Sequence, residues 1–297
     1  MPITCEVMEL ASRLHYRVGM DKPTHSIGVL LREWRQRRRL SQLELAVQAE
    51  VSSRHLSFIE TGRSQPSREM VLRLAEELAI PMRERNVLLV AGGYAPVFAQ
   101  RSLDDPALVA ARNAIDLVLE AQKPYPAFAI DRHWLVVASN AALPELYAGV
   151  LPTLLQPPIN VLRLSLHPHG LAPRIANLRE WRAHLLAATR RRIDVTGDQV
   201  LAELLREVSE YPVPAAKSPV QIAANDQAVI VPFKIVTSAG LLSFFSTTTV
   251  FGTPVDVTLS ELALELFFPA DAATADIVRR LANDSTDQPR PAIAAAE

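Results

Sequence analysis

The stretch from Leu40 to Ser67, LSQLELAVQAEVSSRHLSFIETGRSQPS, constrains the fold of this chain more than any other. It holds two short helical patterns, 41–50 and 52–61, with almost nothing between them. Small Ala46 leaves room for the second helix to cross the first closely. Four apolar side chains fill the angle between the helices: Leu45, Val51, Leu56 and Ile59. We therefore predict a helix-turn-helix rather than an ordinary helical hairpin in a core.

The second of these helices has one polar face that is free to enter a DNA groove. Arg54 can make a bidentate contact to guanine, and Phe58 can meet a thymine methyl group. Arg63 can hold a phosphate, and Ser67 caps the next helix, where free backbone amides can do the same. The remaining DNA contacts that we expect are Ser52, Ser53, His55 and Ser57.

Three further helical patterns, at 26–38, 67–78 and 82–91, complete an all-α five-helix domain over residues 26–98. At the start of the helix 41–50, Ser41 and Glu44 have the spacing of a capping box.

The charge of the chain is unevenly distributed. Residues 26–98 contain eleven Arg, no Lys and eight Glu, a net charge of +3 in a chain whose net charge is −1. A basic excess confined to one domain suits contact with the DNA backbone. Arg37, Arg38 and Arg39, at the end of the first helix, are expected to face solvent or phosphate.

Residues Ile27 to Ala91 resemble the Cro/CI-type repressor domain of the XRE family of bacterial regulators. The resemblance is carried by L-S-Q-x-E-L-A, by V-S-x-x-x-L-S-x-I-E-x-G-R and by the P-S that follows. It implies that Gln42 contacts DNA and that Arg35 and Glu60 form an internal ion pair. One position departs from the family: Glu50 stands where glycine is usual, because this turn tends to need a left-handed residue. We expect strain or a slightly altered turn at Glu50, and not a different fold.

The length, the overall composition and the cysteine content indicate an ordinary globular protein. The 297 residues are enough for two domains, and 49% hydrophobic with 21% charged residues is ordinary for a globular protein. A single cysteine, Cys5, excludes an internal disulfide. No apolar run is long enough to span a membrane, so we expect a cytoplasmic protein with an N-terminal extension over residues 1–25.

A linker helix is expected within residues 99–123, beginning at Asp105-Pro106 and ending near Gln122. A DNA-binding protein with one short recognition helix usually works as a dimer on two half-sites. This helix could join two copies of the chain into a homodimer, or it could pack on its own C-terminal domain.

From residue 124 the pattern changes to short strands, which predict an α+β PAS-like domain with an antiparallel sheet over residues 124–271. In the last strand, 258–268, Leu264 and Leu266 alternate with Glu265, as in a strand with one buried and one solvent face. The residues 272–297 are expected to form a flexible tail. The other expected strands are 127–131, 134–140, 228–237 and 241–249, with helices at 176–192 and 198–211.

This half resembles the ligand-binding domain of MmyB-like regulators, through F-A-I-D-R-x-W-x-V-V-A-S-N at 128–140, V-L-R-L-S-L-H-P at 161–168 and E-L-F-F-P-A-D at 265–271. The resemblance implies a pocket for a small apolar ligand, with fatty-acid-like molecules as the best candidates. Its carboxylate could meet Arg132, His133, Arg174 or Arg182. The expected lining residues are Phe128, Trp134, Trp181, Leu185, Phe233, Phe244 and Phe245.

The sequence leaves two other classes of function to consider, an enzyme and a protein whose C-terminal domain only dimerises. An enzyme is disfavoured, because H-P-H at 167–169 has no accompanying metal-ligand motif and S-F-F-S-T-T-T lacks the glycines of a nucleophile elbow. We expect no cofactor and no metal. A C-terminal domain that only dimerises is the other alternative. The favoured hypothesis is a ligand-responsive transcription regulator that binds double-stranded operator DNA.

Overall fold

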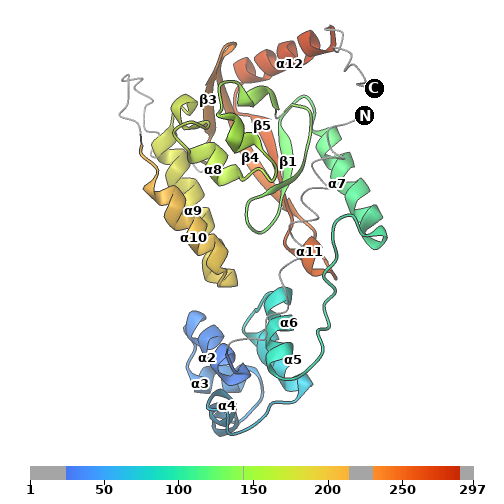
Figure 1. Ribbon diagram of the computed structural model, residues 1–297, viewed down its shortest axis with the longest axis vertical. Coiled ribbons are helices and arrows are strands. Elements are labelled where there is room, and N and C mark those ends of the chain that lie inside the picture. Colours follow the sequence, from blue (N-terminus) through green and yellow to red (C-terminus); the bar gives the residue numbers. More distant parts are fainter. Residues whose placement is uncertain (1–24, 143, 214–229, 288–297) are drawn as a thin grey trace.

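The computed structural model describes residues 25–142, 144–213 and 230–287 (Figure 1). Cys5 and nearly all of the predicted N-terminal extension lie outside these residues. The described chain forms two domains, a helical one below and a sheet-containing one above in Figure 1. The predicted fold class, an all-α domain followed by an α+β domain, is confirmed.

Five short helices make up the N-terminal domain, and each begins and ends within a few residues of its predicted position. Ser41 and Glu44 form the predicted capping box, in which Ser41 Oγ accepts from the Glu44 amide at 3.1 Å. The core is apolar and includes Leu31, Leu45, Leu56, Ile59 and Leu74. The helices are α2 (Ile27–Arg37), α3 (Gln42–Gln48), α4 (Ser53–Glu60), α5 (Arg68–Glu77) and α6 (Met82–Ala91).

In the turn between α3 and α4, Glu50 has a left-handed backbone with φ 53°, which is the strain expected of a residue with a side chain at this position. Ala46 is buried, as its small side chain predicted. A second close approach was not predicted: a Cβ atom on Gly28 would lie 2.3 Å from the carbonyl oxygen of Ile59. Glycine at this position therefore lets α2 lie directly against the end of α4.

The expected linker helix is present as a short 3-10 turn, Pro106–Leu108, followed by α7 (Val109–Ala121). Its inner side packs on the sheet through buried Ile115 and Leu119. The opposite side leaves apolar residues exposed, with Leu117 at 71%. The helix therefore packs on its own C-terminal domain and also presents an uncovered apolar face.

A five-stranded antiparallel sheet forms the centre of the C-terminal domain, in the order β2-β1-β5-β4-β3. The last strand is shorter than predicted, because residues Val257–Ser260 form the short helix α11. Residues 228 and 229 of the predicted third strand lie outside the described residues. The strands are β1 (Ala127–Ile130), β2 (Val136–Ser139), β3 (Phe233–Thr237), β4 (Gly240–Val250) and β5 (Ala263–Pro269).

Helices cover both faces of this sheet. On one face lie α8 (Val161–Leu166), α9 (Leu178–Thr196) and α10 (Gln199–Glu210), together with short 3-10 turns. The ends of α9 and α10 project toward α2 of the N-terminal domain (Figure 1). On the other face lies α7, and α12 (Ala272–Asp287) packs against β4 and β5.

The helix α12 corrects the prediction of a flexible tail from residue 272. Asp271 Oδ1 accepts from the Thr274 amide at 2.7 Å, and Thr274 Oγ1 accepts from the Ser243 amide of β4 at 3.0 Å. Val278 joins the domain core. The polar, alanine-rich composition was mistaken for a disordered segment, although its apolar residues follow a helical spacing. Residues 288–297 lie outside the described residues.

Candidate DNA-binding face, ligand cavity and domain interface

The outer side of α4 carries most of the residues expected to contact DNA. Ser53 and Arg54 are exposed, and Ser57 and Phe58 are half-buried beside them. The Arg54 guanidinium lies 5.4 Å from the centre of the Phe58 ring. Ser52 precedes the helix and caps it, accepting from the His55 amide at 3.1 Å. These side chains form one surface, as the sequence predicted.

The loop after α4 extends this surface. Gly62 has a φ of 73°, which turns the chain away from the helix, and Arg63 follows it as an exposed side chain. Ser67 is also exposed and caps α5 by accepting from the Met70 amide at 3.2 Å. Both residues have the environment expected of phosphate contacts.

The side chain of Gln42 has a partner within the domain. Its Nε2 donates to Glu60 Oε2 at 2.8 Å. The same carboxylate accepts from Arg35 Nε at 2.6 Å and from Arg35 Nη2 at 2.9 Å, which confirms the predicted internal ion pair. Gln42 therefore ties α3 to the ion pair between α2 and α4, and its contact with DNA stays a prediction.

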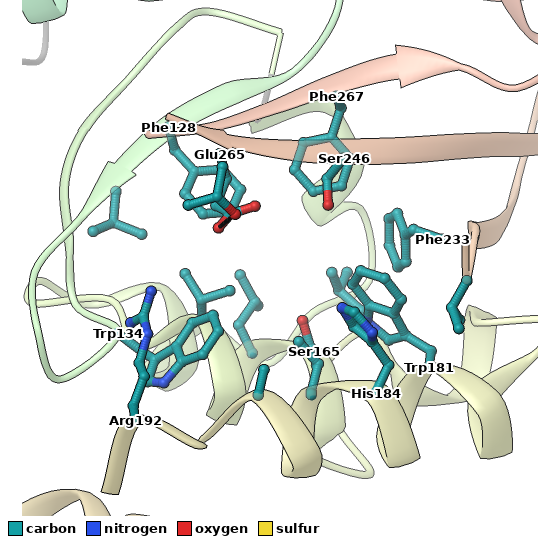
Figure 2. Close-up of a pocket in the computed structure, with 18 of the residues that line it drawn as sticks. Phe128, Trp134, Ser165, Trp181, His184, Arg192, Phe233, Ser246, Glu265 and Phe267 are labelled. Atoms are coloured by element: carbon teal, nitrogen blue, oxygen red, sulfur yellow. Dashed lines mark hydrogen bonds between the residues drawn. The ribbon is translucent and has the colours of Figure 1, made fainter. Parts of the chain in front are cut away.

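A cavity of about 500 Å³ lies between the sheet and the helices α8 and α9 (Figure 2). Its size is within the usual range of small-molecule sites. Five of the seven predicted lining residues border it: Phe128, Trp134, Trp181, Leu185 and Phe233. Phe267 of β5 completes the aromatic wall, with its ring centre 5.8 Å from that of Phe128.

Trp134 reaches this cavity from the tight turn that joins β1 to β2. Asp131 Oδ1 accepts from the backbone amides of His133 and Leu135, at 2.8 and 2.9 Å. Trp134 between them has a φ of 65°, an unfavourable value for a residue with a side chain. Local strain of this kind is characteristic of residues held in place for a function.

Phe244 and Phe245 do not line the cavity as predicted. They are adjacent on β4, so their side chains point to opposite faces of the sheet. Phe244 is fully buried in the core, whereas Phe245 stacks on Phe268 on the outer face, with ring centres 5.4 Å apart. The next inward residues of β4, Ser246 and Thr248, border the cavity instead.

The charged side chains of the cavity also differ from those predicted. Arg192 of α9 and Glu265 of β5 line it. Glu265 was expected on a solvent face, but the sheet is covered on both sides and the glutamate face is the cavity face. Burial raises the pKa of Glu265, against the lowering effects of the Thr248 hydrogen bond and of Arg192.

The four residues proposed to meet a ligand carboxylate have other partners. Arg174 donates to three backbone carbonyl oxygens, those of Val236, Leu146 and Ala148. Arg182 donates to the carbonyl oxygens of Ser209 and Tyr211. Both arginines therefore tie loops of the domain together.

Arg132 and His133 lie at the interface between the two domains. His133 Nε2 lies 2.9 Å from Asp198 Oδ2, and Arg132 Nη1 lies 3.4 Å from the same oxygen. Burial acts to raise the pKa of Asp198, but the His133 hydrogen bond and the charge of Arg132 outweigh it and lower this pKa to about 2. Arg132 also approaches Glu84 of α6 and Glu261, both at 3.8 Å.

Arg83 strengthens this interface by a bidentate ion pair across the domains. Its Nε and Nη2 each lie 2.7 Å from an oxygen of Glu261. Beside it, burial raises the pKa of Glu84 to about 7, although Arg132 acts to lower it. The sequence did not predict this cluster, because its members come from distant parts of the chain.

The basic end of α2 forms the second part of the interface, not a solvent or phosphate contact. Arg37 Nη1 donates to the carbonyl oxygen of Ile193 at 3.2 Å. Arg38 donates to those of Asp194 and Val195, at 3.2 and 3.1 Å. These carbonyls belong to the last turn of α9, where intrahelical donors run out; that of Ile193 also accepts from the Gly197 amide at 2.7 Å. Two arginines of the DNA-binding domain thus cap the helix that forms a cavity wall.

Metal-ligating residues do not gather in the part of the chain that the structure describes: no group of three His, Cys, Asp or Glu side chains could hold an ion there. His167 and His169 contact each other with ring centres 5.6 Å apart. Among the described helices, none has the length and apolar character to cross a membrane.

The exposed helix-turn-helix and the separate cavity-bearing domain define a DNA-binding transcription regulator with a ligand-binding domain. Residues 111–281 match the family described as MmyB-like transcription regulator ligand binding domain. This match spans more than half of the chain, and the chain belongs to that family. Residues 26–88 match a helix-turn-helix domain family. The two resemblances identified from the sequence are confirmed.

Solved structures similar to parts of the chain include two of the clp gene regulator ClgR from Corynebacterium glutamicum, both 31% identical with a TM-score of 0.20. One covers 23% of this chain and 84% of its own, the other 33% and 90%. An RNA-binding light-oxygen-voltage receptor is 14% identical, covers 95% of this chain and 69% of its own, and has a TM-score of 0.24. TM-scores this low carry no conclusion about function. No curated protein matches the chain.

Proposed function

We propose that this chain is a cytoplasmic, ligand-responsive regulator that binds a roughly palindromic operator as a homodimer and senses a fatty-acid-like molecule. One observation carries the proposal. Helix α9 lines the cavity through Trp181, Leu185 and Arg192, and its last carbonyl groups accept hydrogen bonds from Arg37 and Arg38. A molecule that fills the cavity therefore presses on a helix that the DNA-binding domain holds.

Base contacts are assigned to the outer face of α4. Arg54 is the side chain with the reach and the donors for a guanine, and Phe58 lies beside it for a thymine methyl. Ser53, Ser57 and His55 complete the base-contacting set. Arg63, Ser52 and Ser67 are assigned to the phosphates on either side.

The homodimer follows from the size of the recognition helix. An eight-residue helix contacts one half-site, and two half-sites about 34 Å apart are needed for a specific operator. The exposed apolar face of α7 suits the contact between copies, because Val109 and Leu117 are 42% and 71% exposed there.

A fatty-acid-like ligand suits the cavity because aromatic and aliphatic side chains make up most of its wall, while Arg192 and Glu265 add charged groups. A ligand can shift the position of the DNA-binding domains only if it binds two arrangements of α9 unequally. Two such arrangements would differ in the hydrogen bonds from Arg37 and Arg38 to the end of α9, which are formed in one arrangement and broken in the other.

The second candidate function is a C-terminal domain that only dimerises, and the uncovered face of α7 favours it. Native mass spectrometry of the purified full chain, followed by organic extraction, separates the two. A dimer that carries one lipid-like molecule per subunit supports the sensing function. A dimer without any bound molecule, whose affinity for a selected operator is unchanged by dodecanoate, supports dimerisation alone.

The DNA-binding part of the proposal is tested with an operator selected from random duplexes. Binding to it should weaken steeply with salt, because several phosphates displace counterions. The full chain should bind with a stoichiometry of two chains per duplex. Affinity that is insensitive to salt would argue against the proposed contact with DNA.

A further inference from the structure

One side of the cavity is polar. Arg192 from α9 and Glu265 from β5 border it from opposite walls (Figure 2), and the charge of each acts on the other. The Arg192 guanidinium lies 4.2 Å from the centre of the Trp134 ring, and Glu265 Oε1 accepts from Thr248 Oγ1 at 2.8 Å. The two charged groups share a space but form no ion pair with each other in the described structure.

The guanidinium of Arg192 has unused hydrogen-bond donors. A guanidinium carries five N–H donors, and none of those of Arg192 has a hydrogen-bond acceptor among the described residues. Its stacking on Trp134 holds the group in place without using these donors. A partly buried cation of this kind is best matched by an anionic group with several acceptor atoms, for which a carboxylate has the right geometry.

Glu265 would then face a second carboxyl group. Two carboxylates in contact are strongly repelled, so such pairs hold one proton between them. Burial already favours the protonated form of Glu265, and the hydrogen bond from Thr248 orients it. A neutral carboxyl can donate its proton to a neighbouring carboxylate, whereas an ionised one cannot.

We propose that the cavity binds the carboxyl group of an apolar-chain acid between Arg192 and Glu265, with one proton shared by the two carboxyl groups. This inference rests on the proposed ligand-sensing function. Where the free acid and Glu265 are both ionised, one proton comes from water on binding. The O–H of one carboxyl donates to an oxygen of the other, and Arg192 compensates the remaining negative charge.

The other titratable and charged groups near Arg192 and Glu265 should not produce the same pH dependence of binding between pH 7 and 9. The pKa of His184, stacked on Trp181, is lowered by burial and by the charge of Arg191. Burial raises the pKa of Tyr147. The remaining charged groups here are Asp131, whose charge acts on Arg192, and Arg191, at the rim.

The experiment measures binding of dodecanoate and of 1-dodecanol to the full chain by tryptophan fluorescence from pH 6 to 9. Dodecanoate affinity should fall by up to about tenfold for each pH unit above the pKa of Glu265, because one proton is taken up. The alcohol needs no proton and should bind with a flat profile. Calorimetry in two buffers of different ionisation enthalpy should give an uptake near one proton at pH 8.

Two variants test the two residues separately. Glu265→Gln replaces the shared proton by an amide N–H, so dodecanoate should bind within about threefold of its wild-type affinity at pH 6 and lose its pH dependence. Arg192→Gln should weaken dodecanoate at least tenfold and dodecanol less than threefold. Arg190→Gln, an exposed arginine on the same helix that does not line the cavity, is the matched control and should change neither.

The outcomes are distinct. A flat dodecanoate profile in the wild type, or an equal loss of both probes in Arg192→Gln, overturns this inference and leaves ligand sensing in place. Failure of the wild type to bind either probe overturns both.

Discussion

Arg38 donates from Nη2 to the backbone carbonyl oxygen of Val195 at 3.1 Å, across the boundary between the two domains. On its other side, Arg38 Nε donates to the carbonyl oxygen of Leu78 at 2.7 Å. One guanidinium thus joins the C-terminal end of α5, in the DNA-binding domain, to that of α9, in the cavity wall. Each helix end presents carbonyl groups that lack intrahelical donors and favour a nearby cation.

Replacing Arg38 by alanine should uncouple the two domains. We expect dodecanoate to bind with unchanged affinity, while its effect on operator affinity falls to less than half. The lost hydrogen bonds should lower the free energy of unfolding by about 1–2 kcal/mol. Arg32→Ala, an exposed arginine on the same helix, is the control. Coupling that survives in Arg38→Ala would mean that the ligand acts through another contact.

Replacing Arg54 by alanine should weaken operator binding by about 1–3 kcal/mol and relax the choice of base at one position. Arg63→Ala is the comparison, because a phosphate contact should be lost equally on operator and random DNA, with a salt slope shallower by about one. Competition titrations against single-base operator variants distinguish the two. If Arg54→Ala loses affinity equally on all sequences, Arg54 touches only the backbone.

Much of the helix-turn-helix could be predicted from the sequence because its determinants are local. The capping box of Ser41 and Glu44 lies within one turn of helix, and the strain at Glu50 follows from the short turn between α3 and α4. The ion pair of Arg35 and Glu60 was accessible only through the family resemblance, since 25 residues separate them.

The errors in the C-terminal domain have a different origin. Glu265 alternates with leucines as a solvent-facing residue would, but α7 covers the leucine face and the glutamate face borders the cavity. Alternation shows that a strand has two different faces and leaves open what covers each. Likewise, Arg37 and Arg38 were expected to face solvent or phosphate because their acceptors lie more than 150 residues away.

Filling the cavity from α9 should abolish ligand binding without unfolding the domain. Ala188 borders the cavity, so Ala188→Phe should occupy part of its volume and weaken dodecanoate more than tenfold. Stability should stay equal or rise by about 0.5–2 kcal/mol, as for other cavity-filling changes. Ala183→Phe, on the exposed side of the same helix, should leave binding unaltered. Undiminished binding in Ala188→Phe would place the ligand elsewhere.

The interface should become weaker as pH rises, through Glu84. Burial raises the pKa of this carboxyl to about 7 in the joined domains, and separation or unfolding returns it to its ordinary value near 4.3. Between these values the folded form binds a proton that the unfolded form lacks, so stability falls as pH rises through this window. Asp198 contributes no slope there, because its pKa is lowered to about 2.

Glu84→Gln removes the titrating proton while keeping the size of the side chain. Urea unfolding at pH 5, 6, 7 and 8 should show wild-type stability falling relative to the variant, by on the order of 2 kcal/mol across the range. Groups that titrate in both proteins change both stabilities equally, so they cancel in the difference between the two stability profiles. Glu76→Gln, an exposed glutamate of α5, should run parallel to the wild type. A parallel profile for Glu84→Gln would instead mean that Arg132 keeps Glu84 ionised throughout, so that the carboxylate is a permanent partner in the ion cluster with Asp198 and Glu261.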